Sequence, residues 1–163
     1  MARGILISVM PLEMYRALRD AALVSEIYFM VGLLSLATGL MVPFASRFMP
    51  RRWIYVTGCA MFAGGAAMGA QGGALGMIAA LALITAATVT VFVCFNAYVL
   101  DFISKSDLGR CETSRMFYSA LGWTVGPFLG VTLLGLWRPL PFLIAGLAAL
   151  SMMALFLYMR LGN

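Results

Sequence analysis

The residues of this chain that could do chemistry are charged, and they gather in short segments between long apolar runs. Arg47, Arg51 and Arg52 form a basic turn, and residues 101–115 form the longest polar segment. The acids of that segment stand among basic residues, which is typical of a solvated connector with ion pairs rather than of a catalytic cluster. The chain has no histidine, the commonest general base and metal ligand. We therefore do not expect an enzyme.

The remaining reactive groups are three thiols. Cys59 and Cys94 lie inside apolar runs, and Cys111 lies in the polar segment 101–115. No pair of them has the spacing of a metal site or of a disulfide framework. They are interpreted as small apolar side chains with one spare thiol, and neither a metal nor a cofactor is predicted.

The surroundings of the basic turn predict the class of protein. Residues 27–46 and 53–100 hold no charge. An arginine at the centre of a membrane helix costs about 2.5–3.5 kcal/mol, so the turn must lie outside the hydrocarbon, between two helices that cross it. The composition agrees, because 63% of the residues are hydrophobic and 10% are charged, whereas a soluble domain is about 25% charged. The chain is predicted to be an integral membrane protein with the lipid bilayer as its first partner.

The apolar runs predict an all-α, polytopic helical bundle. Five membrane spans are expected, over 27–46, 53–70, 74–100, 116–137 and 140–159. They form a five-helix bundle within residues 16–163, and residues 16–26 are expected to be a polar connector. Residues 1–15 hold too short an apolar run to cross a bilayer. They are interpreted as the end of a partial first transmembrane helix or, alternatively, as a short interfacial helix.

The distribution of basic residues predicts the orientation. Alternating spans place seven basic residues on one side of the membrane and three on the other. The first side holds Arg47, Arg51, Arg52, Lys105, Arg110, Arg115 and Arg160; the other holds Arg16, Arg19 and Arg138. The richer side is expected to be cytoplasmic, together with the C-terminus. The net charge of +5 is explained in this way, and no nucleic-acid partner is expected, because no basic patch is interleaved with aromatic residues.

One predicted span carries a motif that could permit motion. Gly122, Gly126 and Gly130 recur every four residues, so they share one face, where another helix can approach to backbone contact. Pro127 has no N–H group, so a bend is expected there. The pattern fits two helices that rock or slide, and it fits tight packing without motion as well.

These motifs resemble the N-terminal half of a major facilitator superfamily transporter. That family carries a fifth-helix motif, Gly-x-x-x-Gly-Pro-x-x-Gly-Gly, which Gly122, Gly126, Pro127 and Gly130 match, whereas Val131 replaces the last glycine. The resemblance covers nearly the whole chain, and it makes residues 1–15 the end of the first helix.

The basic turn carries the second part of the resemblance. The family has a basic loop between its second and third helices, and the basic residues of Pro43-Phe-Ala-Ser-Arg47-Phe-Met-Pro-Arg51-Arg52 match it. Ser46 stands where the family has an aspartate, and one residue is inserted. An acid that closes the fourth helix and an arginine that opens the fifth are matched by Asp101 and Arg115.

The resemblance implies a role for these charges at a cytoplasmic gate. In the family, the basic loop pairs with acids at the cytoplasmic helix ends and stabilises the outward-facing state. For this chain it implies that Arg47, and Arg51 or Arg52, lie near Asp101. The alternative is that the arginines only anchor the topology.

The function implied by the resemblance is transport of a small solute. The chain would supply one half of the transporter, and its partner would be a second copy or a second six-helix half. Thr88 and Asn96 are candidate polar groups of the pathway, and Glu26 is a candidate proton acceptor or a solvated interfacial residue. The expected location is a cell membrane, the bacterial inner membrane in particular. The alternative function is a small helical scaffold or assembly partner.

Overall fold

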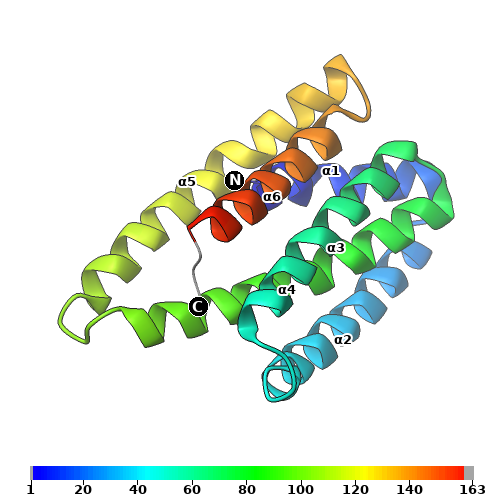
Figure 1. Ribbon diagram of the computed structural model, residues 1–163. Helices are drawn as coiled ribbons and strands as arrows, with labels where there is room; N and C mark the ends of the chain where they lie inside the picture. The colour runs from blue at the N-terminus through cyan, green and yellow to red at the C-terminus, as the bar shows by residue number, and fades with distance from the viewer. Residues whose placement is uncertain (1, 160–163) are drawn as a thin grey trace.

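The chain folds into a bundle of helices, shown in Figure 1 as a computed structural model that describes residues 2–159. Within these residues there are six helices and no strand. They are α1 (Ala2–Leu18), α2 (Ala21–Ala45), α3 (Arg51–Gln71), α4 (Ala74–Phe102), α5 (Leu108–Leu136) and α6 (Leu140–Tyr158). Helices α2 to α6 are each long and apolar enough to cross a membrane. The predicted all-α membrane bundle is thereby confirmed.

The connection between α1 and α2 is shorter than the polar composition of residues 16–26 suggested. Helix α1 ends at Leu18, and Arg19 then adopts the left-handed conformation, with φ of 54°. The carboxylate of Asp20 accepts hydrogen bonds from the backbone N–H groups of Ala22 and Leu23, at 2.9 and 3.3 Å. A side-chain cap of this kind satisfies N–H groups that the first helical turn leaves without partners, so α2 begins at once.

The polar segment 101–115 is also more helical than expected. Helix α4 continues to Phe102, and α5 begins at Leu108 rather than near 116. The hydroxyl of Ser104 donates to the carboxylate of Asp107 at 2.8 Å in the short loop between them. The sequence criterion followed the apolar part of each helix, whereas both helices continue with polar residues beyond it. As a result Glu112 and Arg115 lie on α5.

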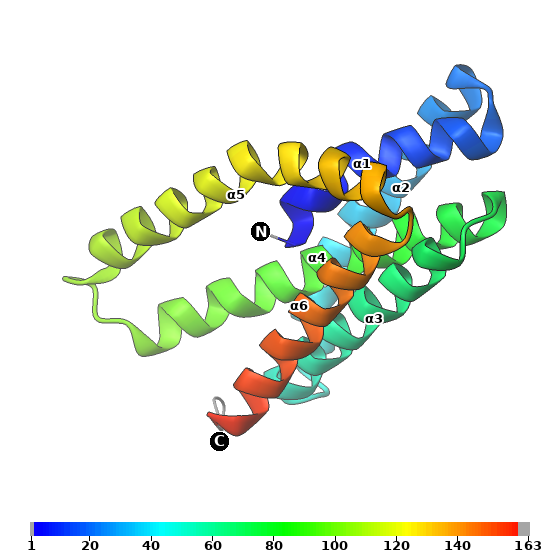
Figure 2. The same cartoon turned by 90° about the horizontal axis from the view of Figure 1, so that it is seen from above.

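The helices define two ends of the bundle (Figures 1 and 2). The first, here called the basic end, holds the α2–α3 turn, the α4–α5 loop and the end of α6. The opposite end holds the α1–α2, α3–α4 and α5–α6 turns. The α3–α4 turn contains Gly72 and Gly73 with φ of 78° and 86°, as the sequence predicts for a glycine turn. Arg160 and Asn163, which the predicted topology assigns to the cytoplasmic side, lie outside the described residues.

The core lies where α1, α3, α4 and α6 meet. It includes Met14, Met77 and Phe142, each at most 1% exposed. On α3, a Cβ atom added at Gly69 would lie 2.6 Å from the ring of Phe142, so only glycine allows α6 to pack this closely. Helices α3 and α4 form the centre, and their close packing holds the elements that carry the charges of the basic end.

Two long helices lie at the edges of this core. Helix α2 buries only Val31 and Val42, and α5 buries only its glycine stripe and Leu134. Their other large apolar side chains are exposed, among them Leu40 on α2 and Phe128 on α5. Such helices are covered by lipid or by another membrane helix.

Candidate functional site

The basic end brings two of the predicted gate charges together. Arg51 at the start of α3 forms an ion pair with Asp101 near the end of α4. Both side chains are about half exposed, at 44% and 53%. Arg47 is exposed in the α2–α3 turn and makes no ion pair with another described residue, whereas Arg52 is partly buried on the first turn of α3. The Arg51–Asp101 pair therefore joins α3 to α4 at the membrane surface.

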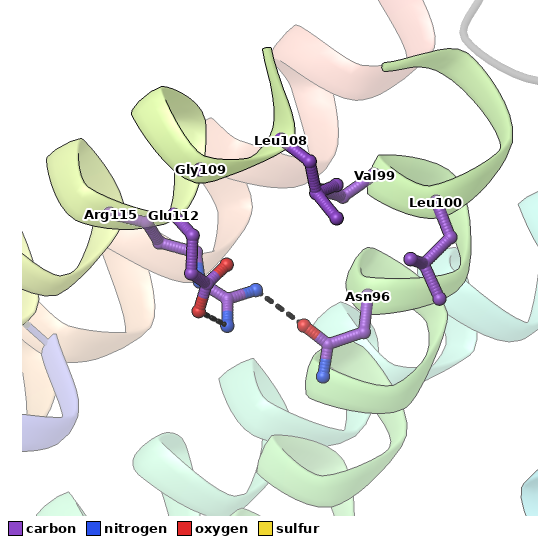
Figure 3. A pocket seen from close by; sticks show the side chains of 7 residues that line it. All are labelled: Asn96, Val99, Leu100, Leu108, Gly109, Glu112 and Arg115. Atoms are coloured by element: carbon purple, nitrogen blue, oxygen red, sulfur yellow. Dashed lines mark hydrogen bonds and ion pairs between the residues drawn. The ribbon is translucent and has the colours of Figure 1, made fainter. Parts of the chain in front are cut away.

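Arg115, the remaining predicted gate charge, takes different partners. One guanidinium nitrogen donates to the side-chain oxygen of Asn96 on α4, and another donates to Glu112 at 2.6 Å (Figure 3). The same guanidinium lies over the rings of Phe92 and Phe95, at 5.6 and 5.8 Å from their centroids. Arg115 thus connects α5 to α4 through Asn96. Asn96 precedes Asp101 on α4, so this contact lies farther from the basic end than the Arg51–Asp101 pair.

A cleft of about 500 Å³ lies between α4 and α5 at this place (Figure 3). It is lined by Asn96, Val99, Leu100, Leu108, Gly109, Glu112 and Arg115. The cleft combines apolar walls with one guanidinium, one carboxylate and one amide.

The glycine stripe of α5 lies against the first half of α1. A Cβ atom at Gly126 would lie 2.5 Å from the backbone of Gly4, and one at Gly130 would lie 2.3 Å from the carbonyl oxygen of Ile5. Gly122 faces Gly4 as well, since a Cβ atom on Gly4 would meet its backbone oxygen. The stripe thus allows backbone contact between the two helices.

Pro127 lies inside α5, which continues through it as one helix. Figure 2 shows the α5 ribbon as curved over this region. The hydroxyl of Ser8 on α1 donates to the carbonyl oxygen of Pro127 at 3.3 Å, so the proline lies at the same α1–α5 contact as the glycines.

The sequence analysis missed Glu13, the most deeply buried ionisable residue described. Its side chain is 1% exposed. It accepts hydrogen bonds from Arg16 on α1 at 2.9 Å and from Arg138 in the α5–α6 turn at 2.5 Å. The signal was present in the spacing, because Ile5, Val9 and Glu13 recur every four residues on the buried face of α1.

The other predicted polar groups are isolated. The hydroxyl of Thr88 donates to the carbonyl oxygen of Ile84 on its own helix at 2.6 Å, and Glu26 is exposed near the start of α2. No group of three or more His, Cys, Asp or Glu residues within residues 2–159 could hold a metal ion. Cys59 and Cys94 are buried and Cys111 is partly buried, all as free thiols.

Comparison with known proteins gives no relative. No family model, no curated protein and no solved structure matches the chain. The function is therefore inferred from the residues and packing described above.

Proposed function

We propose that this chain forms one half of a secondary transporter of the major facilitator type, which moves a small solute across a membrane. The resemblance of the two sequence motifs is the starting point. The helix packing, the charges at the basic end and the uncovered edge helices each support the proposal.

The observation that carries it is the pattern of helix contacts. The most extensive contacts are α3–α4, α1–α5, α3–α6, α2–α4, α1–α6 and α1–α4. If α1 is exchanged with α4, α2 with α5 and α3 with α6, the same six pairs of helices result. The first three helices therefore pack in the same pattern as the last three. Because α1 and α4 run in opposite directions, the two three-helix units are inverted relative to each other. Transporters of this superfamily contain 3+3 inverted repeats within each half, whereas a scaffold has no need of one.

The Arg51–Asp101 pair suits a gate that opens and closes. An exposed ion pair contributes about 0–1 kcal/mol, so it can break and form again without disturbing the bundle. Its position at the end with more basic residues favours a cytoplasmic gate, with the C-terminus on the same side. The bacterial inner membrane is the location we favour.

The edge helices support a partner. With most of their apolar side chains exposed, α2 and α5 offer surfaces for a second copy of this chain or for a separate six-helix half. In this proposal the solute crosses between the two halves, where Asn96 and the partly buried Thr88 are candidate contacts. Glu26 remains a candidate only as an interfacial residue.

The second candidate function is a membrane scaffold. The same poorly covered faces of α2 and α5 favour it, because an assembly partner needs only packing surfaces. It differs from transport in one respect: the Arg51–Asp101 pair would have no reason to open.

Reconstitution tests the proposal. The chain is cross-linked in mild detergent to report its assembly, and vesicles are then screened for uptake of neutral metabolites and drugs. We expect self-association, with uptake only by the assembled form. A double variant, Arg51→Cys with Asp101→Cys, should lose uptake when its disulfide forms and regain it on reduction. A strictly monomeric chain that still moved a solute would contradict the half-transporter proposal, and an assembled chain that moved none would favour the scaffold.

A further inference from the structure

One arginine lies near the middle of the membrane rather than at either end of the bundle. The uncharged part of α5 covers residues 116–136, and Gly126 is its middle residue. A Cβ atom at Gly126 would lie 2.5 Å from the backbone of Gly4, so Arg3, the residue before Gly4 on α1, lies at about the same level. Charged residues at this depth are rare, and they face a bundle interior or a water-filled space.

The guanidinium of Arg3 is held by a ring and keeps its hydrogen-bond donors for another group. It lies 5.8 Å from the centroid of the Trp123 ring on α5, which is within the range of a cation–π contact. Arg3 is exposed, and it forms no ion pair and no hydrogen bond with another described residue. A guanidinium has five N–H donors in a planar fork that matches the two oxygens of a carboxylate. Arg3 is therefore ready to receive an anion.

The exposed face of α1 lies where the proposed function places the solute. Helices α4 and α6 pack on the buried face of α1, which leaves its exposed face between α2 and α5. These are the two helices to which the proposed function assigns the second half. Arg3 thus faces the space between the halves, where water can hydrate its charge, and not the hydrocarbon, where an unpaired guanidinium is costly.

We propose that Arg3 and Trp123 bind the solute and that the solute is an organic carboxylate, a substrate class that rests on the proposed transport function. The carboxylate accepts two hydrogen bonds from Arg3, and the apolar part of the solute lies against the ring of Trp123, which is 54% exposed. Arg3 is the one cation at this level among residues 2–159. A phosphate monoester carries about 1.5–2 negative charges at neutral pH, which one guanidinium does not balance.

The test follows binding by the fluorescence of Trp123. The chain has three tryptophans, so Trp53→Phe with Trp137→Phe leaves Trp123 alone. This chain, purified in mild detergent, is titrated with butyrate and with butyramide, which has the same size and no charge. A carboxylate bound to the guanidinium changes the emission of the ring beside it. We expect butyrate to bind roughly tenfold or more tightly than butyramide, the scale of one charge-assisted hydrogen bond. Equal affinities, no binding of either compound, or tighter binding of propyl phosphate would overturn the proposal.

Two variants and a matched control locate the binding. Arg3→Gln should remove the preference for butyrate, whereas Arg3→Lys should keep part of it, because an ammonium retains the charge but not the planar fork. The control is Arg110→Gln, which removes an exposed arginine near the basic end and should leave the preference unchanged. A preference that survived Arg3→Gln, or that fell equally in Arg110→Gln, would contradict the site.

Uptake by vesicles separates this inference from the transport proposal. We expect the assembled parent chain to take up carboxylates and the Arg3→Gln chain to take up none. Selective binding of butyrate by a chain that moves no solute would retain the anion site and count against transport. Uptake of neutral solutes without selective binding of butyrate would retain transport and overturn the carboxylate site.

Discussion

Each end of the bundle has an ion pair that joins two segments distant in sequence, and the two pairs differ in burial. Glu13 at the opposite end is 1% exposed, whereas Asp101 at the basic end is 53% exposed. A carboxylate removed from water depends on its partners, because losing one leaves a buried charge uncompensated. A carboxylate at the surface is rehydrated at once. The comparison teaches that the buried pair is structural, and that the exposed pair is the one able to open and close.

The largest effect should come from Arg138→Met, which leaves Arg16 as the one ion-pair partner of Glu13 among the described residues. We expect a loss of about 2–4 kcal/mol in the free energy of unfolding, measured by thermal or denaturant unfolding in detergent. The double variant, Arg138→Met with Glu13→Gln, should lose less than the single one, because no buried charge then remains with only Arg16 to compensate it. If the double variant lost the sum of the two single effects, the buried charge would not be the cause of the loss.

The next effect should come from Gly126→Leu on α5. Its side chain would meet the backbone of Gly4 and separate α1 from α5, at a cost of roughly 1–3 kcal/mol. It should thereby weaken the opposite end, where α1 supplies Glu13, and leave the Arg51–Asp101 pair of α3 and α4 intact. The matched control is Phe128→Leu, whose side chain is 72% exposed. Equal melting shifts for the two variants would show that the α1–α5 contact does not depend on the glycine.

A smaller effect is expected of Asp101→Asn. Because both partners are about half exposed, the loss should be at most about 1 kcal/mol, and it should shrink further as salt screens the pair. Unfolding measured at low and high ionic strength checks this, with the exposed Glu26→Gln as the control. A loss as large as that of Arg138→Met would abolish the contrast between the two ends.

A labelling experiment sharpens the comparison by locating the two ends relative to the membrane. Single cysteines are placed at residues 49 and 106 of the basic end, and at 20 and 138 of the opposite end, in a chain where Cys111→Ser removes the partly buried native thiol. Labelling from outside intact cells should reach 20 and 138 and not 49 and 106. Rapid labelling at 49 or 106 alone would reverse the orientation.

The sequence predicts those features of the fold that hydrophobicity determines. Long uncharged runs specify the five spans, and glycine at 72 and 73 specifies the turn between α3 and α4. It does not specify where a helix continues into polar residues, because such residues satisfy a helix and a loop equally well. That is why the first turns of α5, with Glu112 and Arg115, were expected in a loop.

The contacts of the candidate site also fall into two groups, those that the sequence predicts and those that it does not. Alternating spans imply that Arg51 and Asp101 lie at helix ends on the same side of the membrane, whereas their proximity is what the family resemblance implies. The pairing of Glu13 with Arg138 and of Arg115 with Asn96 depends on how helices pack face to face. Such contacts need the rotation of each helix about its axis, and a single sequence carries this only weakly.

The contact between α1 and α5 has a consequence for the synthesis and assembly of the protein. Ser8 and Pro127 are 119 residues apart, and Glu13 and Arg138 are 125 residues apart. At a synthesis rate of about 5–20 residues per second, roughly 6–25 seconds separate the appearance of Glu13 from that of Arg138. During this interval the nascent α1 carries a carboxylate whose α5–α6 partner does not yet exist. Packing of α1 into the bundle is therefore incomplete until the last hairpin is made, and ribosomes stalled before residue 138 should release a chain that quality-control proteases recognise.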